Sequence, residues 1–128
     1  MSEAMSKVQH FDEAGLTQAL AAHELVLLAF WAPWCGPCQA FAPVFAEVAD
    51  EYDDVLFGKV NVDAEPSLAA QFNVRSIPMV MAVREGLVLY AQAGGVSASA
   101  LRELISHVQV VDMVEVRAAL AGGDVTDD

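Results

Sequence analysis

The chain has 128 residues, of which 55% are hydrophobic and 19% are charged. This length suits one domain with its own core, and the composition excludes disorder over most of the chain. The formal net charge of -12, from 18 acidic and 6 basic residues, argues against binding to nucleic acid or to anionic membranes, because such a surface repels phosphate groups.

The first quarter of the chain predicts a tail, two strands and a helix. Residues 1–7 are predicted to form a flexible N-terminal tail, which a short strand over residues 8–10 follows. Residues 11–22 predict a helix whose acidic first turn suits the helix dipole. The run LVLLAFWA, residues 25–32, is apolar without alternation, so it predicts a central strand that is buried on both faces.

A second helix and a third strand are predicted next. Residues 35–52 place apolar side chains at helical spacing, with acidic residues on the opposite face. Pro43 lies inside this pattern and is expected to kink the helix rather than end it. Residues 55–62 predict the strand, which contains one lysine, Lys59, among apolar neighbours.

The next part of the chain predicts a short helix and a hairpin. Residues 67–72 predict the helix, with Ser67 as its cap. Residues 79–83 and 87–93 are two apolar runs separated by a short turn, and this pattern predicts a β-hairpin.

Two further helices are predicted towards the C-terminus. Ser97 or Ser99 caps the first of them, which extends to about residue 108. Residues 110–128 form a C-terminal extension, for which we predict a short helix with Asp112 as N-cap and Gly122-Gly123 as its end. The chain then closes on an acidic end.

This order of elements predicts an α/β fold. Strands alternate with helices before a hairpin and a last helix, which implies a mixed central sheet with helices on both faces. Residues 8–109 are predicted to form this domain. The extra C-terminal helix is expected to bury its apolar face either on this domain or on a partner.

The motif Trp34-Cys35-Gly36-Pro37-Cys38 follows the buried strand and begins the second helix. Within the first helical turn, this spacing brings the two sulfurs close enough to bond. It also leaves Cys35 at the helix N-terminus, where free N–H groups and the helix dipole stabilise a thiolate. We therefore expect Cys35 to attack a disulfide and the more buried Cys38 to resolve the mixed disulfide.

A CxxC motif has two other uses in proteins. The motif could supply two of the four ligands of a zinc site. The other candidate ligands lie far apart in the sequence without metal-ligand spacing, namely His10, His23 and His107, so no metal is expected unless a dimer shares the site. A purely structural disulfide would close a loop of only two residues and gain little from it. Redox exchange is the favoured interpretation.

The chain is expected to be cytoplasmic. Both cysteines lie in one motif, which is not the pattern of a secreted disulfide scaffold. The first fifteen residues carry acidic side chains where a secretory signal would be basic and then apolar. The apolar run of residues 25–34 is too short to span a bilayer.

The segment FWAPWCGPC, residues 30–38, resembles the active site of the thioredoxin family. Further segments match in the same order: a kink proline at Pro43, the strand of residues 59–63, residues 74–78 ending in a proline, and the pair Gly94-Gly95. The resemblance covers residues 8–109 and implies a thioredoxin-like fold.

The resemblance also implies a substrate groove. Pro78 would be cis and would hold Ile77 so that its backbone pairs with an extended substrate segment. The groove around Cys35 would be lined by Trp34, Ile77, Pro78, Gly94 and Gly95. Trp34 is expected to be exposed. Met79 stands where a small polar residue is common in the family, and it is either a core filler or part of a binding surface.

The implied function is that of a general protein-disulfide reductase in cell redox homeostasis and electron transport. Thioredoxin reductase would be the electron donor, and disulfide-containing proteins would be the substrates. The redox-active Cys35–Cys38 disulfide would take the place of a bound cofactor, and we expect a monomer. Gly36-Pro37 favours reduction over oxidation or isomerisation, because oxidising relatives often carry a histidine there. A binding or chaperone module with weak redox activity is the alternative.

Ala29 is the main departure from the family pattern. Thioredoxins usually carry a buried aspartate at this position, which exchanges a proton with the second cysteine. Lys59, the usual partner of that carboxylate, is retained, and we expect it to lean to solvent or to find another acid. It is either structural or tunes the cysteines electrostatically. We hypothesise that Cys38 loses its proton to water or to Lys59, and that resolution is slower than usual.

Overall fold

A computed structural model describes residues 7–126 of the chain. Its elements follow one another in the order β1 (Gln9–His10), α1 (Glu13–Ala22), β2 (Leu25–Trp31), α2 (Gly36–Ala49), β3 (Leu56–Asn61), α3 (Pro66–Gln71), β4 (Met79–Arg84), β5 (Leu87–Ala93), α4 (Ala98–Gln109) and α5 (Met113–Thr126). Of the predicted tail, residues 1–6 lie outside the described residues, and the Lys7 ammonium pairs with Asp53.

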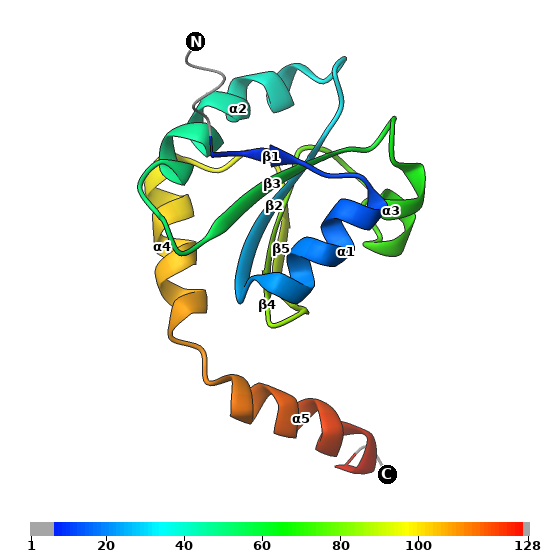
Figure 1. The fold of residues 1–128 in the computed structure, drawn as a ribbon, viewed down its shortest axis with the longest axis vertical. Helices are drawn as coiled ribbons and strands as arrows, with labels where there is room; N and C mark the ends of the chain where they lie inside the picture. The colour runs from blue at the N-terminus through cyan, green and yellow to red at the C-terminus, as the bar shows by residue number, and fades with distance from the viewer. Residues whose placement is uncertain (1–6, 127–128) are drawn as a thin grey trace.

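The strands form one mixed sheet in the order β1-β3-β2-β4-β5 (Figure 1). β1, β3 and β2 run parallel, whereas β4 pairs antiparallel with both β2 and β5. The predicted hairpin is confirmed, and its turn places Glu85 and Gly86 at positive φ. The predicted α/β class with a mixed central sheet is therefore confirmed.

Strand β2 is central because its side chains are buried on both faces of the sheet. Leu27 and Ala29 face the core that α2 and α4 cover, and Leu28 and Phe30 face the core that α1 and α3 cover. This arrangement confirms the interpretation of its continuous apolar run. Parallel strands covered on both faces lose the polar alternation of half-exposed strands.

The ends of the helices show which capping predictions hold. Ser97 is the N-cap of α4, since its Oγ accepts a hydrogen bond of 3.1 Å from the Ala100 N–H. The prediction that Ser67 caps α3 is wrong, because Glu65 occupies the cap position and Pro66 begins the helix. Proline suits the first helical position because its fixed φ is already helical and no N–H is lost there.

Helix α5 begins as predicted and ends later. The Asp112 carboxylate accepts hydrogen bonds from the N–H groups of Val114 and Glu115, at 3.0 and 3.2 Å. The helix does not end at Gly122-Gly123 but continues to Thr126. A glycine inside a helix costs about 1 kcal/mol relative to alanine, which weakens a helix without breaking it.

Helix α5 extends away from the sheet, at the opposite end of the molecule from the start of α2 (Figure 1). Its first residue, Met113, is buried, whereas Val114 and Leu120 are 76% and 59% exposed. The helix is thus attached to the domain near its start, through Met113 and through Arg117, which pairs with Glu85. None of the helices within residues 7–126 has the length and apolar character that a membrane crossing needs.

Candidate functional site

The CxxC motif lies where β2 passes into α2. Cys35 is the N-cap of α2, and Gly36 and Pro37 open the helix and are exposed. A disulfide joins Cys35 to Cys38, whose Cα atoms are 5.2 Å apart. The Cys38 N–H also donates to the Cys35 Sγ at 3.2 Å. This N–H is one of the free donors of a helix start, so the same contact would stabilise a thiolate on Cys35.

The two cysteines are equally buried, each being 4% exposed. The expectation that Cys38 is the more buried of the pair is therefore wrong for this disulfide form. The disulfide joins the two side chains at the start of α2, so both lie in the same buried surroundings.

A cis peptide bond before Pro78 brings the β4 strand to this site. The bond Ile77-Pro78 is cis, as the resemblance implies, and Pro78 is buried while Ile77 is half-buried. The Gly94 N–H donates to the Pro78 carbonyl at 2.7 Å, with Gly94 at φ +96. The start of β4 and the turn after β5 are thus held together.

Gly95 ties the same turn to α2. A Cβ atom at this position would lie 3.2 Å from the Phe41 Cβ, which is closer than ordinary van der Waals contact. Phe41 lies one helical turn beyond Cys38, so a side chain at position 95 would require the turn or Phe41 to shift by a few tenths of an ångström. The structure thereby brings Pro78, Gly94 and Gly95 to the α2 side of the sheet.

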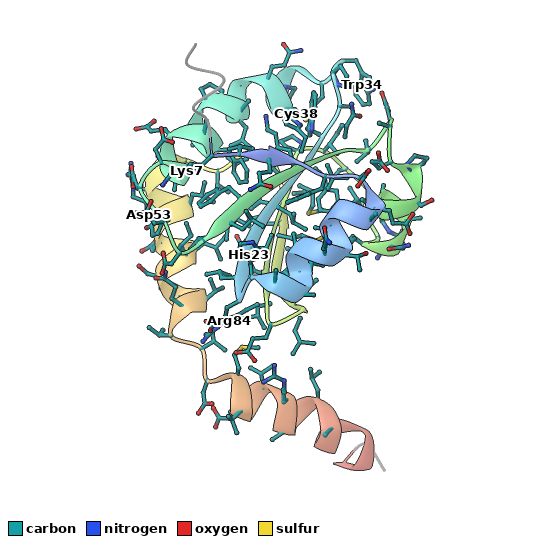
Figure 2. The ribbon with its side chains drawn as sticks, in the orientation of Figure 1. Lys7, His23, Trp34, Cys38, Asp53 and Arg84 are labelled. Carbon is teal, nitrogen blue, oxygen red and sulfur yellow. A yellow bond between two sulfur atoms is a disulfide. The ribbon has the colours of Figure 1, made fainter. Side chains whose placement is uncertain are left out.

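Trp34 is 70% exposed, which confirms the prediction that it lies at the surface. Its Nε1–H donates to the Asp63 carboxylate at 2.9 Å. Asp63 follows β3 and was not predicted as a site residue. The signal that could have found it is topological, because parallel neighbours β2 and β3 end at the same edge of the sheet. Figure 2 shows Trp34 and Cys38 at this end of the molecule.

Residues Ala29, Lys59 and His10 are register partners across β2, β3 and β1. Ala29 is 2% exposed and packs in the cluster that contains Phe41 and Phe45. A methyl group there can neither accept a proton from Cys38 nor pair with Lys59. The position that the family gives to a carboxylate is therefore apolar core in this chain.

Lys59 is half-buried, and its Nζ lies 5.3 Å from the centroid of the Trp31 ring. None of the ion pairs among the described residues includes Lys59. Burial lowers the pKa of the Lys59 ammonium below its ordinary value. Of the two expected outcomes, solvent or another acid, the ion pairs of residues 7–126 do not bear out the acid, and the half-buried ammonium lies over an aromatic face.

Met79 is half-buried and packs against the core cluster on the α1 and α3 face of the sheet. Of the two interpretations of Met79, this packing favours the core filler. Within residues 7–126, no three His, Cys, Asp or Glu side chains gather in a way that could hold a metal ion. The chemistry at this end of the molecule is that of two adjacent sulfurs.

Sequence comparison places this chain among known proteins. The family model described as Thioredoxin matches residues 7–107. A putative thioredoxin 2 from Streptomyces coelicolor is 40% identical over 117 residues, which cover 91% of this chain and 87% of the relative. Thioredoxin from Haemophilus influenzae is 39% identical over 105 residues, which cover 80% of this chain and 98% of the relative.

Solved structures show the same fold. A mutant thioredoxin from Halobacterium salinarum superposes with a TM-score of 0.77 at 27% identity and covers 82% of this chain and 93% of that one. Thioredoxin from Malassezia sympodialis gives a TM-score of 0.73 at 30% identity, with 80% and 90% covered.

Proposed function

This chain belongs to the thioredoxin family and is a thiol–disulfide oxidoreductase of the protein-disulfide reductase class, and we propose that it serves as a general reductase of protein disulfides. The observation that carries the proposal is the Cys35–Cys38 disulfide at the start of α2, with the Cys38 N–H donating to the Cys35 Sγ. A helix N-terminus lowers a thiol pKa and so increases the thiolate that attacks disulfides.

In the proposed cycle the dithiol form reduces the substrate in two exchanges. The Cys35 thiolate attacks one sulfur of the substrate disulfide, forms a mixed disulfide and releases the other substrate sulfur, which takes up a proton. The Cys38 thiolate then attacks the Cys35 Sγ, and the second substrate thiol leaves. Two electrons pass from the protein to the substrate, and Cys35 and Cys38 end as the disulfide.

We propose that the substrate segment lies extended in the groove formed by Trp34, Ile77, Pro78, Gly94 and Gly95. Three observations support this proposal: Trp34 is exposed, the Gly94 N–H is hydrogen-bonded to Pro78, and Gly95 approaches α2 closely. An extended segment bound through its main chain is recognised with little dependence on its side chains. Such a groove suits a reductase with many substrates.

The reductant in this proposal is thioredoxin reductase, which returns two electrons to the Cys35–Cys38 disulfide after each turnover. The chain then needs no bound cofactor and acts as a monomer, since one chain carries both sulfurs. A reductase of this kind works in a reducing compartment, so we propose the cytoplasm.

We further propose that resolution by Cys38 is the slow exchange. Cys38 must lose its proton before it attacks, and the buried position that could hold a proton acceptor is Ala29. Water or the Lys59 amine would take the proton instead. Lys59 is a candidate because burial lowers the pKa of its ammonium, so the amine form that can accept a proton is reached at lower pH than in an exposed lysine.

Reduction of insulin disulfides by dithiothreitol, with and without the protein, tests the proposed function. We expect acceleration by the wild-type chain and none by Cys35→Ser. The Cys38→Ser variant should accumulate a mixed disulfide with the substrate on Cys35. If wild type and Cys35→Ser gave the same rate, the reductase proposal would be wrong.

A binding or chaperone module is the second candidate, and the exposed Val114 and Leu120 on α5 favour it. Such a module would suppress the aggregation of an unfolded protein equally well as wild type and as Cys35→Ser. Removing residues 113–128 would abolish this effect and leave insulin reduction unchanged. The two candidates therefore differ in which part of the chain they need.

A further inference from the structure

A pocket of about 410 Å³ lies beside β1 and β3, and none of its lining residues belongs to the groove around Cys35. His10, Trp31 and Lys59 contribute to it from three neighbouring strands, and Asp12 and Glu65 contribute from the loops that lead into α1 and α3. It thus opens at the carboxyl ends of parallel strands, the usual place for ligands in α/β sheets. Figure 1 shows α1 and α3 on the same side of the sheet.

Two residues that line this pocket carry hydrogen-bond donors for which residues 7–126 supply no acceptor. Among the described residues, the Trp31 Nε1–H is buried without a hydrogen-bond partner. The Lys59 ammonium, 5.3 Å from the Trp31 ring centroid, takes part in none of the ion pairs of the described residues. A buried donor without an acceptor costs about 1–3 kcal/mol, so an oxygen ligand at this place would be stabilising.

The positive charge of the pocket is that of one group. The imidazole ring of His10 lies 6.1 Å from the Trp31 ring, and burial together with the nearby Lys59 ammonium lowers the pKa of His10. His10 is therefore neutral at pH 7, and Lys59 alone is cationic. One cation and one N–H donor match the single charge and two oxygens of a carboxylate better than a dianion.

Two carboxylates line the same pocket. Neither Asp12 nor Glu65 takes part in an ion pair among the described residues, although the Asp12 carboxylate accepts the Gly15 N–H as the cap of α1. They would repel phosphate or a dicarboxylate and attract a positive group. A ligand that satisfies Lys59 and tolerates these acids must carry both charges.

We infer that this pocket binds a small zwitterionic carboxylate, such as a free α-amino acid. Its carboxylate accepts hydrogen bonds from the Lys59 Nζ and the Trp31 Nε1, and its ammonium faces Asp12 and Glu65. Lys59 is shared with the proposed proton transfer from Cys38, so binding is tested on the oxidised protein, in which no exchange occurs and no activity is measured.

Glycine is the smallest probe that carries both charges, and acetate and methylamine carry one each. We would titrate each, and inorganic phosphate, into ¹⁵N-labelled protein at constant ionic strength and follow the two indole N–H signals by NMR. Trp34 already donates to Asp63 and serves as the internal control. Trp34→Phe identifies its signal by removing it.

Glycine should shift the Trp31 indole signal downfield and saturably, while the Trp34 signal stays in place. Acetate should bind at least about tenfold more weakly, since it lacks one charge pair, and methylamine and phosphate should not saturate. Lys59→Gln should weaken glycine binding at least about tenfold. Lys7→Gln, which changes an exposed lysine outside the pocket, should leave it unchanged.

If Lys59→Gln does not fold, Glu65→Gln provides a second test of the site. It should weaken glycine binding and leave acetate binding unchanged or stronger. The inference is overturned if glycine causes no saturable shift of Trp31, which would mean that only water occupies the pocket. It is equally overturned if acetate or phosphate binds as tightly as glycine, or if folded Lys59→Gln binds glycine normally.

Discussion

The two ends of the molecule differ in how they are held (Figure 2). At the end that carries Trp34 and Cys38, the main chain holds the turn after β5: the Gly94 N–H bonds to the Pro78 carbonyl, and the Gly95 backbone lies against Phe41. At the end that carries α5, side chains make them, since Arg84 and Arg117 hold the helix to the domain. Backbone contacts depend on few side chains, so the redox end should tolerate surface substitutions that would release α5.

Arg84 is the main attachment at the α5 end. Its Nη1 donates to the carbonyls of Val108 and Val111 at 2.8 and 2.7 Å, and its Nη2 donates to the Glu24 carboxylate at 2.9 Å. Val108 belongs to the last turn of α4, whose carbonyls have no intrahelical partner. The guanidinium thus closes α4 and fixes the direction in which the chain enters α5.

Replacing one large apolar residue at each end, buried at one and exposed at the other, should give the largest contrast. Phe41 is 5% exposed and packs with Phe45, whereas Leu120 on α5 is 59% exposed. We expect Phe41→Ala to lower the free energy of unfolding by about 3–5 kcal/mol, because it leaves a cavity in the core. Leu120→Ala should change it by less than about 0.5 kcal/mol. Urea denaturation measures both, and similar losses would contradict the comparison.

The two arginines at the α5 end should differ from each other. Arg84→Met should lower the free energy of unfolding by about 1–3 kcal/mol, because it leaves the Val108 and Val111 carbonyls without their donor. Arg117 pairs with Glu85 and has a 52% exposed side chain, against 14% for Arg84. Arg117→Met should therefore cost less than about 1 kcal/mol.

Limited proteolysis reports the same difference locally. Cleavage in residues 110–112 should become faster in Arg84→Met and change little in Arg117→Met. Of these two arginines, Arg84 is the one that donates a hydrogen bond to a backbone carbonyl of this linker, that of Val111. Equal cleavage rates in both variants would show that Arg84 does not fix the linker.

At the redox end, the predicted effect is kinetic. Ala29→Asp supplies a buried carboxylate beside Lys59, which can accept the Cys38 proton, and we expect resolution of a mixed disulfide to become at least about tenfold faster near neutral pH. Ala29→Asn is the matched control, since it has the same size but accepts no proton. Stopped-flow kinetics against pH would separate them, and an unchanged rate and pH profile in Ala29→Asp would contradict the slow-resolution proposal.

Most of the fold and the reactive pair were predictable from the sequence, because they depend on local patterns. The apolar run of residues 25–32, the CxxC spacing and the Ser97 cap each act within a few residues. The late end of α5 was not predictable in this way, since the Gly122-Gly123 pair can either end a helix or lie within it.

The contacts that the sequence did not predict join residues far apart along the chain. The Trp34–Asp63 hydrogen bond spans 29 positions and follows from two parallel strands ending at one edge of the sheet. Lys59 was expected to seek an acid or solvent, and it lies over the Trp31 ring of the adjacent strand. The periodicity of a strand shows on which face of the sheet a side chain lies. It does not show which side chain of a neighbouring strand lies next to it on that face.

The smallest predicted effect is a pH dependence of stability from Lys59. Burial lowers the pKa of its ammonium in the folded state below the ordinary value of 10.5. At a pH below the lowered pKa both states are protonated, and the folded protein bears the full cost of the half-buried charge. As pH rises through the lowered pKa towards 10.5, the folded state loses its proton first, so stability rises relative to a chain without Lys59.

Comparing wild type with Lys59→Met from pH 7 to pH 10.5 isolates this effect, because the high-pH charge repulsion of the rest of the chain is common to both. The difference in unfolding free energy should move in favour of wild type as pH rises. Its slope should stay well below the roughly 1.4 kcal/mol per pH unit of a full proton, since the side chain is half exposed and solvent screens it. Lys7→Met should show no such slope against wild type, as Lys7 is exposed and pairs with Asp53. A slope of opposite sign in Lys59→Met would mean that the ammonium is stabilised where it lies, and that the Trp31 ring more than compensates for the missing carboxylate at position 29.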